Sequence, residues 1–149
     1  TDADVKAHRY RKPSDRKPLR DLFYTLTGTT VLNNGDSISE AWRQERVNTL
    51  QFRWHSTPPS YYGWHEKGKT AIALAADISI CSVAETMLHE LVHAVCLTDE
   101  LDGHPPLFYE ILTLAAQEAF DMPDSVELTG DEQLTYWLQS VNWSLPAVL

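Results

Sequence analysis

Three histidines and one glutamate are spaced so that they could bind a metal ion and use it. If His89-Glu90-Leu91-Val92-His93 is helical, its two histidines lie about 40° apart around the axis and about 6 Å apart along it. Both imidazoles then leave one helix face and can converge on one cation. Zinc in hydrolytic sites usually takes three protein ligands and keeps a fourth position for water. We predict His104 as the third ligand, because Gly103 permits a tight turn and Pro105-Pro106 suits the start of a new helix.

Glu90 has the chemistry and the position of a general base. It follows His89 by one residue, about 100° further round a helix, which leaves it near the open coordination position. Zinc lowers the pKa of a bound water to about 7, so Glu90 could accept its proton and pass it to a leaving amine. The pattern therefore predicts hydrolysis assisted by Zn²⁺. Asp99, Asp102 and Glu110 are alternative carboxylate ligands, and packing of the histidines in a metal-free core is the alternative to a site.

The histidine motif is predicted to lie on a buried helix. Ser82-Val83-Ala84-Glu85 fits a capping box at its start. Apolar residues then recur at helical spacing, namely Met87, Leu88, Leu91, Val92, Val95 and Cys96. Ionisable groups are costly to bury in such a helix without a partner, and a metal ion would be a suitable partner.

The rest of the chain predicts elements that could hold this helix. The expected elements are a helix from about Leu19 to the Gly28 region, a strand over 47–55, a hairpin joining Tyr62 and Trp64 to Ile72 and Leu74, a helix from Pro105 that ends before Pro123, and an amphipathic segment over 131–141. Ser39 could cap a short segment from Ala41 to Arg46. We therefore predict an α+β fold, with a small antiparallel sheet packed on helices in a zincin-like arrangement.

Length and charge indicate one domain with a basic arm. The 149 residues fit a single domain over 19–149, and residues 1–18 are predicted to be a flexible arm because Pro13 and Pro18 interrupt a polar stretch. Residues 1–20 hold seven basic and three acidic residues, a net charge of +4. Because the whole chain has a net charge of −9, residues 21–149 carry −13. An acidic body repels phosphate backbones, whereas the arm could contact DNA or an acidic partner. A solvated tail without a partner is the alternative.

Cysteine content and hydropathy bear on the expected compartment. Cys81 and Cys96 are too few for a disulfide scaffold, and they fall at opposite ends of the predicted motif helix, so a bridge between them is not expected. The sequence offers no apolar stretch long enough to cross a bilayer and no secretory signal. We therefore predict an intracellular protein, cytoplasmic or associated with a nucleoid or nucleus, without a membrane partner.

The order of these elements resembles the SprT-like (Spartan-type) zinc metallopeptidase domain. The resemblance covers roughly residues 19–120 and is carried by 47–54, Gly63, the strand 72–74, the segment 85–94 and the run Gly103-His104-Pro105-Pro106-Leu107-Phe108. It implies zinc on His89, His93 and His104, Glu90 as the base, and protein substrates that are often bound to DNA. Metzincins place their third histidine six residues after the second, where this chain has Asp99.

Two functions from different classes follow from these residues. The first is a zinc-dependent endopeptidase, and the second is a non-catalytic binding module in which zinc only stabilises the fold. The substrate-binding residues are unknown at this stage, although an edge strand of the hairpin could hold an extended peptide and Tyr61, Tyr62 and Trp64 could line a side-chain pocket. Tyr109 could also donate to an oxyanion, while His55 and His65 are expected to be surface histidines.

Overall fold

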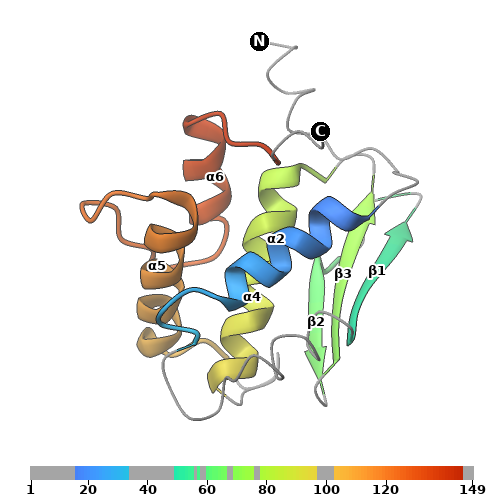
Figure 1. The fold of residues 1–149 in the computed structure, drawn as a ribbon, viewed down its shortest axis with the longest axis horizontal. Helices are drawn as coiled ribbons and strands as arrows, with labels where there is room; N and C mark the ends of the chain where they lie inside the picture. The colour runs from blue at the N-terminus through green and yellow to red at the C-terminus, as the bar shows by residue number, and fades with distance from the viewer. Residues whose placement is uncertain are drawn as a thin grey trace.

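The computed structural model describes residues 16–33, 49–55, 57, 60–66, 69–75, 78–96 and 103–145. Within these ranges the fold is α+β, with four helices and a three-stranded sheet (Figure 1). The elements in chain order are α2 (Lys17–Thr27), β1 (Leu50–His55), β2 (Gly63–Glu66), β3 (Lys69–Ala75), α4 (Ile80–Cys96), α5 (Pro106–Phe120) and α6 (Gln133–Ser140). The basic arm up to Asp15, the strand start at 47–48 and the segment at 41–46 lie outside the described residues.

The sheet is mixed, which corrects the prediction of an antiparallel sheet. Its strand order is β1-β3-β2, so β3 is central. The predicted hairpin is present, with β2 antiparallel to β3 and Trp64 opposite Ala71. Strand β1 instead runs parallel to β3, with Phe52 opposite Ile72. Alternating apolar and polar residues predict a half-buried strand but not its direction, because parallel and antiparallel strands share that period of two.

Helix α4, which carries the histidine motif, lies at the centre of the molecule. The sheet packs on one side of it and helices α5 and α6 on the other, while α2 lies across α4 and contacts it (Figure 1). Apolar side chains around the motif are at most 1% exposed, namely those of Met87, Leu88, Leu91 and Val92. A helix that is apolar around most of its circumference is buried on most sides, as predicted. This burial makes α4 a rigid support for the motif.

The start of α4 differs from the capping box predicted at Ser82. The helix begins at Ile80, and the hydroxyl of Ser79 accepts a hydrogen bond from the Ser82 backbone N–H at 3.1 Å. Ser79 therefore has the role of the N-cap. The carboxylate of Glu85 reaches helix α6 instead, where it accepts hydrogen bonds from the backbone N–H groups of Glu132 and Thr135, each at 2.8 Å.

Helix α2 begins at Lys17, two residues before the predicted start. Arginines at its N-terminal end bind the outer edge of strand β1. The guanidinium of Arg16, just before the helix, donates to the Phe52 carbonyl at 2.8 Å, and Arg20 donates to the Leu50 carbonyl at 3.1 Å. Arg20 also lies 5.6 Å from the centre of the Phe52 ring. These contacts occupy carbonyl groups that an additional strand would need at this edge of the sheet.

The remaining predicted helices are close to their expected positions. Helix α5 spans Pro106–Phe120, and α6 falls inside the predicted segment 131–141. Among the described residues, none of the helices combines the length and apolar character that crossing a bilayer requires. Burial raises the pKa of the Cys81 thiol to about 11, and the side chain of Cys96 lies outside the described part of the structure.

Candidate metal centre

The three predicted histidine ligands converge, and they are close enough to hold a metal ion. The Nε2 atom of His93 lies 3.2 Å from Nε2 of His89 and 3.1 Å from Nε2 of His104. The candidate ligand atoms of all three lie within 4.8 Å of one another. For zinc bound at 2.0–2.1 Å by imidazoles in a tetrahedron, neighbouring nitrogens would be about 3.3 Å apart. The observed spacing therefore suits a cation of about that size.

The chemistry of the ring nitrogens also favours a cation. An imidazole nitrogen offers either one proton or one lone pair, so Nε2 of His93 cannot make two separate linear hydrogen bonds to the other two rings. A metal ion would accept all three lone pairs at once. His93 is fully buried, while the side chains of His89 and His104 are 14% and 19% exposed, so the site opens toward solvent on their side.

Phe108 of helix α5 forms a common packing surface for the three rings. Its ring centre lies 4.9 Å from that of His89, 4.7 Å from that of His93 and 4.5 Å from that of His104. The His104 ring stacks on it with an interplanar angle of 18°. Because Phe108 is fully buried, it restricts how the rings can rotate.

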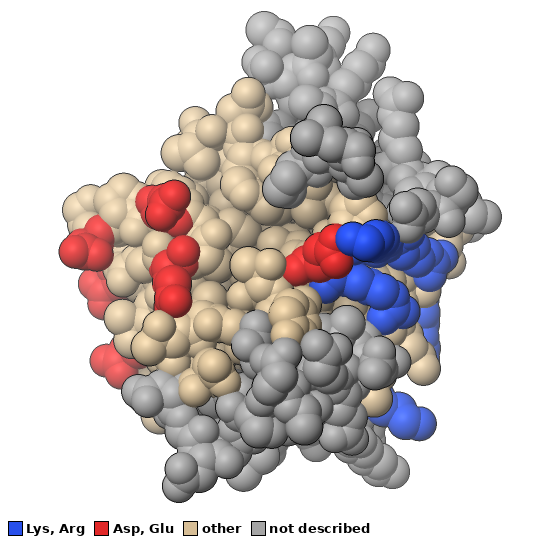
Figure 2. Space-filling view, in the orientation of Figure 1, with Lys and Arg blue, Asp and Glu red and all other residues tan. Residues whose placement is uncertain are grey.

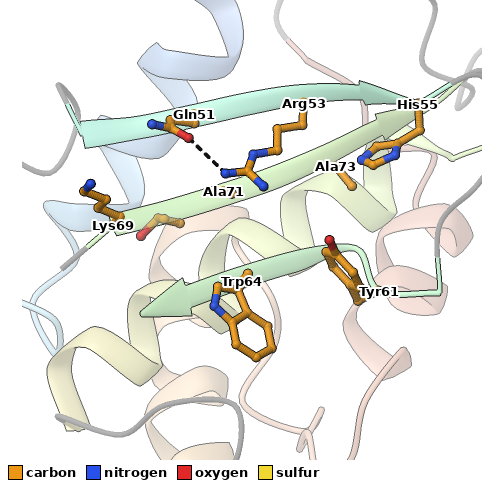
Figure 3. Close-up of a pocket in the computed structure, with 9 residues that line it drawn as sticks. Gln51, Arg53, His55, Tyr61, Trp64, Lys69, Ala71 and Ala73 are labelled. Carbon is orange, nitrogen blue, oxygen red and sulfur yellow. Dashed lines mark hydrogen bonds between the residues drawn. The ribbon is translucent and has the colours of Figure 1, made fainter. Parts of the chain in front are cut away.

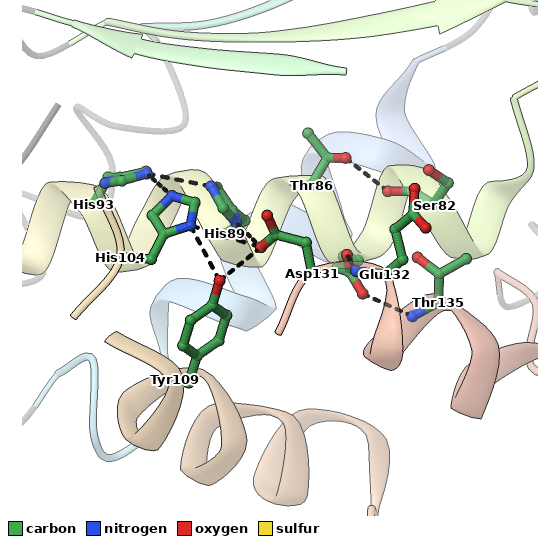
Figure 4. A network of polar contacts seen from close by, with 10 residues as sticks. Ser82, Thr86, His89, His93, His104, Tyr109, Asp131, Glu132 and Thr135 are labelled. Atoms are coloured by element: carbon green, nitrogen blue, oxygen red, sulfur yellow. Dashed lines mark hydrogen bonds and ion pairs between the residues drawn. The ribbon is translucent and has the colours of Figure 1, made fainter. Parts of the chain in front are cut away.

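Asp131 and Tyr109 lie behind His89 and His104, on the side of their Nδ1 atoms (Figure 4). One carboxylate oxygen of Asp131 lies 3.8 Å from Nδ1 of His89 and 3.7 Å from Nδ1 of His104. The Tyr109 hydroxyl lies 3.2 Å from Nδ1 of His104 and donates to that same carboxylate oxygen at 3.1 Å. A negative charge near both Nδ1 atoms favours the tautomer with a proton on Nδ1, in which the lone pair on Nε2 can bind a metal.

Glu85, one helical turn before His89 on α4, helps to position this carboxylate. By accepting hydrogen bonds from Glu132 and Thr135, Glu85 fixes the first turn of α6, and Asp131 immediately precedes that turn (Figure 4). Burial raises the pKa of the Glu85 carboxyl, and the two backbone hydrogen bonds oppose that rise. Burial and the Asp131 charge raise the pKa of Tyr109 to about 12, so its hydroxyl stays a proton donor at neutral pH.

We expect Asp131→Asn to weaken zinc binding about 10- to 100-fold, the usual effect of losing an outer partner of a ligating histidine. The amide removes the negative charge that favours the Nδ1–H tautomer of His89 and His104, with almost no change in shape. Zinc affinity is measured by competition with a chromophoric chelator. Asp121→Asn is the matched control, because it removes the same charge from an exposed residue. Asp121 has a left-handed backbone conformation, which asparagine also tolerates. Equal affinity in Asp131→Asn and wild type would contradict the positioning role.

The general-base candidate Glu90 is buried under strand β2. It is 2% exposed, and its carboxylate and Cγ lie close to the backbone of Gly63. A Cβ atom added at Gly63 would collide with the methyl group of Thr86 and press against Glu90. Glycine at this position therefore allows β2 to pass directly over the motif helix, and the carboxylate of Glu90 lies in the narrow space between them.

The structure supports some of the other sequence predictions about this region and not others. Glu110 is exposed, and the metal-capable group found among the described residues consists of the three histidines. Asp99 and Asp102 lie outside the described residues. The Tyr109 hydroxyl faces Nδ1 of His104 rather than the Nε2 atom that faces His93, which does not favour a role as oxyanion donor. The prediction of a surface His65 was wrong: it is 5% exposed and hydrogen-bonded to Thr70 at 2.9 Å.

A groove of about 690 Å³ begins beside His104 and runs along helix α5. Apolar residues such as Leu114, Val126 and Leu128 share its lining with the carboxylates of Glu110, Asp124 and Glu127. Sequence reasoning did not find this groove, because the loop after α5 carries no distinctive motif. It did not find Asp131 either, since the tertiary fold alone brings that residue near His104.

Comparison of the chain with protein-family models, curated proteins and solved structures finds no match.

Proposed function

We propose that this protein is a zinc-dependent endopeptidase with a zincin-like, SprT-like catalytic domain. The observation that carries the proposal is the convergence of three imidazole Nε2 atoms on one point, with a glutamate next to the first of them in the sequence. Three neutral nitrogen ligands match catalytic zinc sites, which keep one coordination position for water or substrate. The metal ligands in this proposal are His89, His93 and His104.

A bound zinc ion would supply Lewis-acid chemistry, polarising a peptide carbonyl and making water acidic enough to be deprotonated near neutral pH. Glu90 would then take the proton from the attacking water and deliver it to the nitrogen of the departing amine. Burial between Gly63 and helix α4 keeps this carboxylate in a fixed position for both transfers. Asp131 and Tyr109 hold the histidine rings from behind and take no part in the bond cleavage.

The outer edge of strand β2 is the position we propose for an extended peptide substrate. Of the two outer strands in the described sheet, β1 already has its Leu50 and Phe52 carbonyls bonded to arginines of α2. Strand β2 instead passes over Thr86 and Glu90 of the motif helix. A peptide added to β2 by backbone hydrogen bonds would therefore lie along the catalytic residues. The acidic groove beyond His104 is suited to a basic or polar side chain of that substrate.

The proposed substrates are proteins, including DNA-associated ones, and the proposed compartment is intracellular. The resemblance to SprT-like domains supports the substrate class, and the basic residues of the first twenty positions could recruit the enzyme to DNA or to an acidic partner. A structural zinc site in a non-catalytic binding module is the competing function. It would require a fourth protein ligand, and the cluster found among the described residues supplies three.

The decisive test is hydrolysis of an unfolded protein, and of a DNA-bound protein, by the zinc-loaded full chain. We expect new peptide termini to appear in at least one of these reactions, to be absent after a chelator is added, and to return with zinc. Mass spectrometry of the products identifies the cleaved bonds. A chain that binds one zinc ion tightly but cleaves neither substrate would support the structural site instead.

A further inference from the structure

The outer face of the sheet, turned away from helix α4, carries a groove of about 530 Å³ that plays no part in the proposed catalysis. Its floor is made by Ala71 and Ala73 of the central strand, whose side chains are single methyl groups. Longer side chains stand on both sides, with Arg53 from β1 and Trp64 from β2 (Figure 3). The strand register places Arg53 opposite Ala73 and Trp64 opposite Ala71, so the groove runs along β3.

The walls of this groove differ in chemistry. One wall has the exposed aromatic residues Tyr61 and Trp64, which are 51% and 37% exposed, with ring centres 6.4 Å apart. The opposite wall has Arg53, whose guanidinium donates to the Gln51 side chain at 3.3 Å (Figure 3). Lys69 adds a second cation at the start of β3. An aromatic surface beside cations suits a ligand that alternates flat rings with negative charges.

The distribution of charge over the described residues supports an anionic ligand on this side. All their Lys and Arg residues belong to α2, its preceding residue or the sheet, namely Arg16, Lys17, Arg20, Arg53 and Lys69. The described residues after position 78 contain acids but neither Lys nor Arg. Figure 2 shows the cations gathered on the side of α2 and β1, where Asp21 pairs with Lys17, and further acids on the side of α5. The body is thus strongly polarised, although its net charge is negative.

We propose that this outer groove binds single-stranded nucleic acid, with bases stacked on Trp64 and Tyr61 and phosphates held by Arg53 and Lys69. Single strands are bound in this way by other proteins, through aromatic surfaces next to a cationic track. A duplex hides the faces of its bases, so it could not use the aromatic wall. The acidic side of α5 and α6 would repel phosphates and confine the strand to the sheet. This site lies on the opposite face of the sheet from the metal centre and does not depend on the proposed peptidase activity.

The test is fluorescence anisotropy of the full-length chain with a labelled DNA single strand of about 12 nucleotides, within the usual site size. We expect saturable binding that Trp64→Ala weakens about 5- to 150-fold, the range for one lost stacking contact, and that Trp64→Phe largely retains. Replacing both Arg53 and Lys69 with Gln should reduce the slope of log affinity against log salt by about 1.4, or about 0.7 per phosphate contact. All variants keep the basic arm, so any contribution from it stays constant.

Lys17→Gln is the control for the loss of positive charge at Arg53 and Lys69. It removes the same charge from an exposed residue outside the groove, which is paired with Asp21, and we expect it to change the affinity less. Circular dichroism melting verifies that each variant is folded. The proposal is overturned if the wild type shows no saturable binding, or if Trp64→Ala binds like the wild type. It is also overturned if duplex DNA, polyglutamate or a free mononucleotide competes as well as the single strand.

Discussion

Glu90→Gln is expected to retain zinc and to lose peptide hydrolysis by a factor of about 10² to 10⁴, the usual contribution of a general base. Glutamine has nearly the same shape as glutamate, so it should fit the space beneath Gly63 with little change in packing. Its amide cannot accept the proton that the attacking water must lose. The measurement is kcat/KM on a fluorogenic peptide, together with zinc content determined on the same preparation.

Glu110→Gln is the control for this change. It is the same chemical substitution on an exposed residue of α5 that lines the groove beside His104. We expect it to alter the preference among substrate side chains while leaving turnover of a good substrate within a few-fold of wild type. If Glu90→Gln turned over substrate at the wild-type rate while zinc-loaded, Glu90 would not be the base and the mechanism would be wrong.

The convergence of His89, His93 and His104 could be predicted from the sequence because their geometry is mostly local. Two histidines four residues apart on a helix converge whatever the rest of the fold does. The position of His104 depends on the short Gly103 turn, and Gly103 does adopt a positive φ of 80°. The apolar pattern of 87–92 likewise predicted the buried helix without any long-range information.

The residues behind the metal centre could not be predicted in this way. Asp131 is separated from His104 by a helix and a loop, and its position depends on Glu85, which was interpreted as part of a capping box. Glu85 satisfies backbone donors of α6 because tertiary packing brings that helix beside α4. The burial of His65 has a similar cause, since its ring faces inward and bonds to Thr70 on the neighbouring strand. Side-chain partners of this kind become visible only when the fold is known.

His93→Ala is expected to abolish both tight zinc binding and hydrolysis. His93 is the hub of the cluster, because its Nε2 atom is within 3.2 Å of the nitrogens of both other ligands. Loss of a direct ligand should weaken zinc binding by more than the about 100-fold maximum expected for an outer partner such as Asp131. Zinc would then no longer raise the melting temperature, whereas in the wild type zinc at 100 times its Kd should add about 2.7 kcal/mol of stability.

His65→Ala separates this effect from the cost of emptying a buried site. His65 is also a buried histidine, but it bonds to Thr70 and does not belong to the cluster. Both substitutions leave a cavity and should lower the melting temperature of the metal-free protein. We expect only His93→Ala to remove the further rise that zinc produces, because only His93 contributes a ligand. If zinc raised the melting temperature of His93→Ala as much as that of the wild type, the three histidines would not form the binding site.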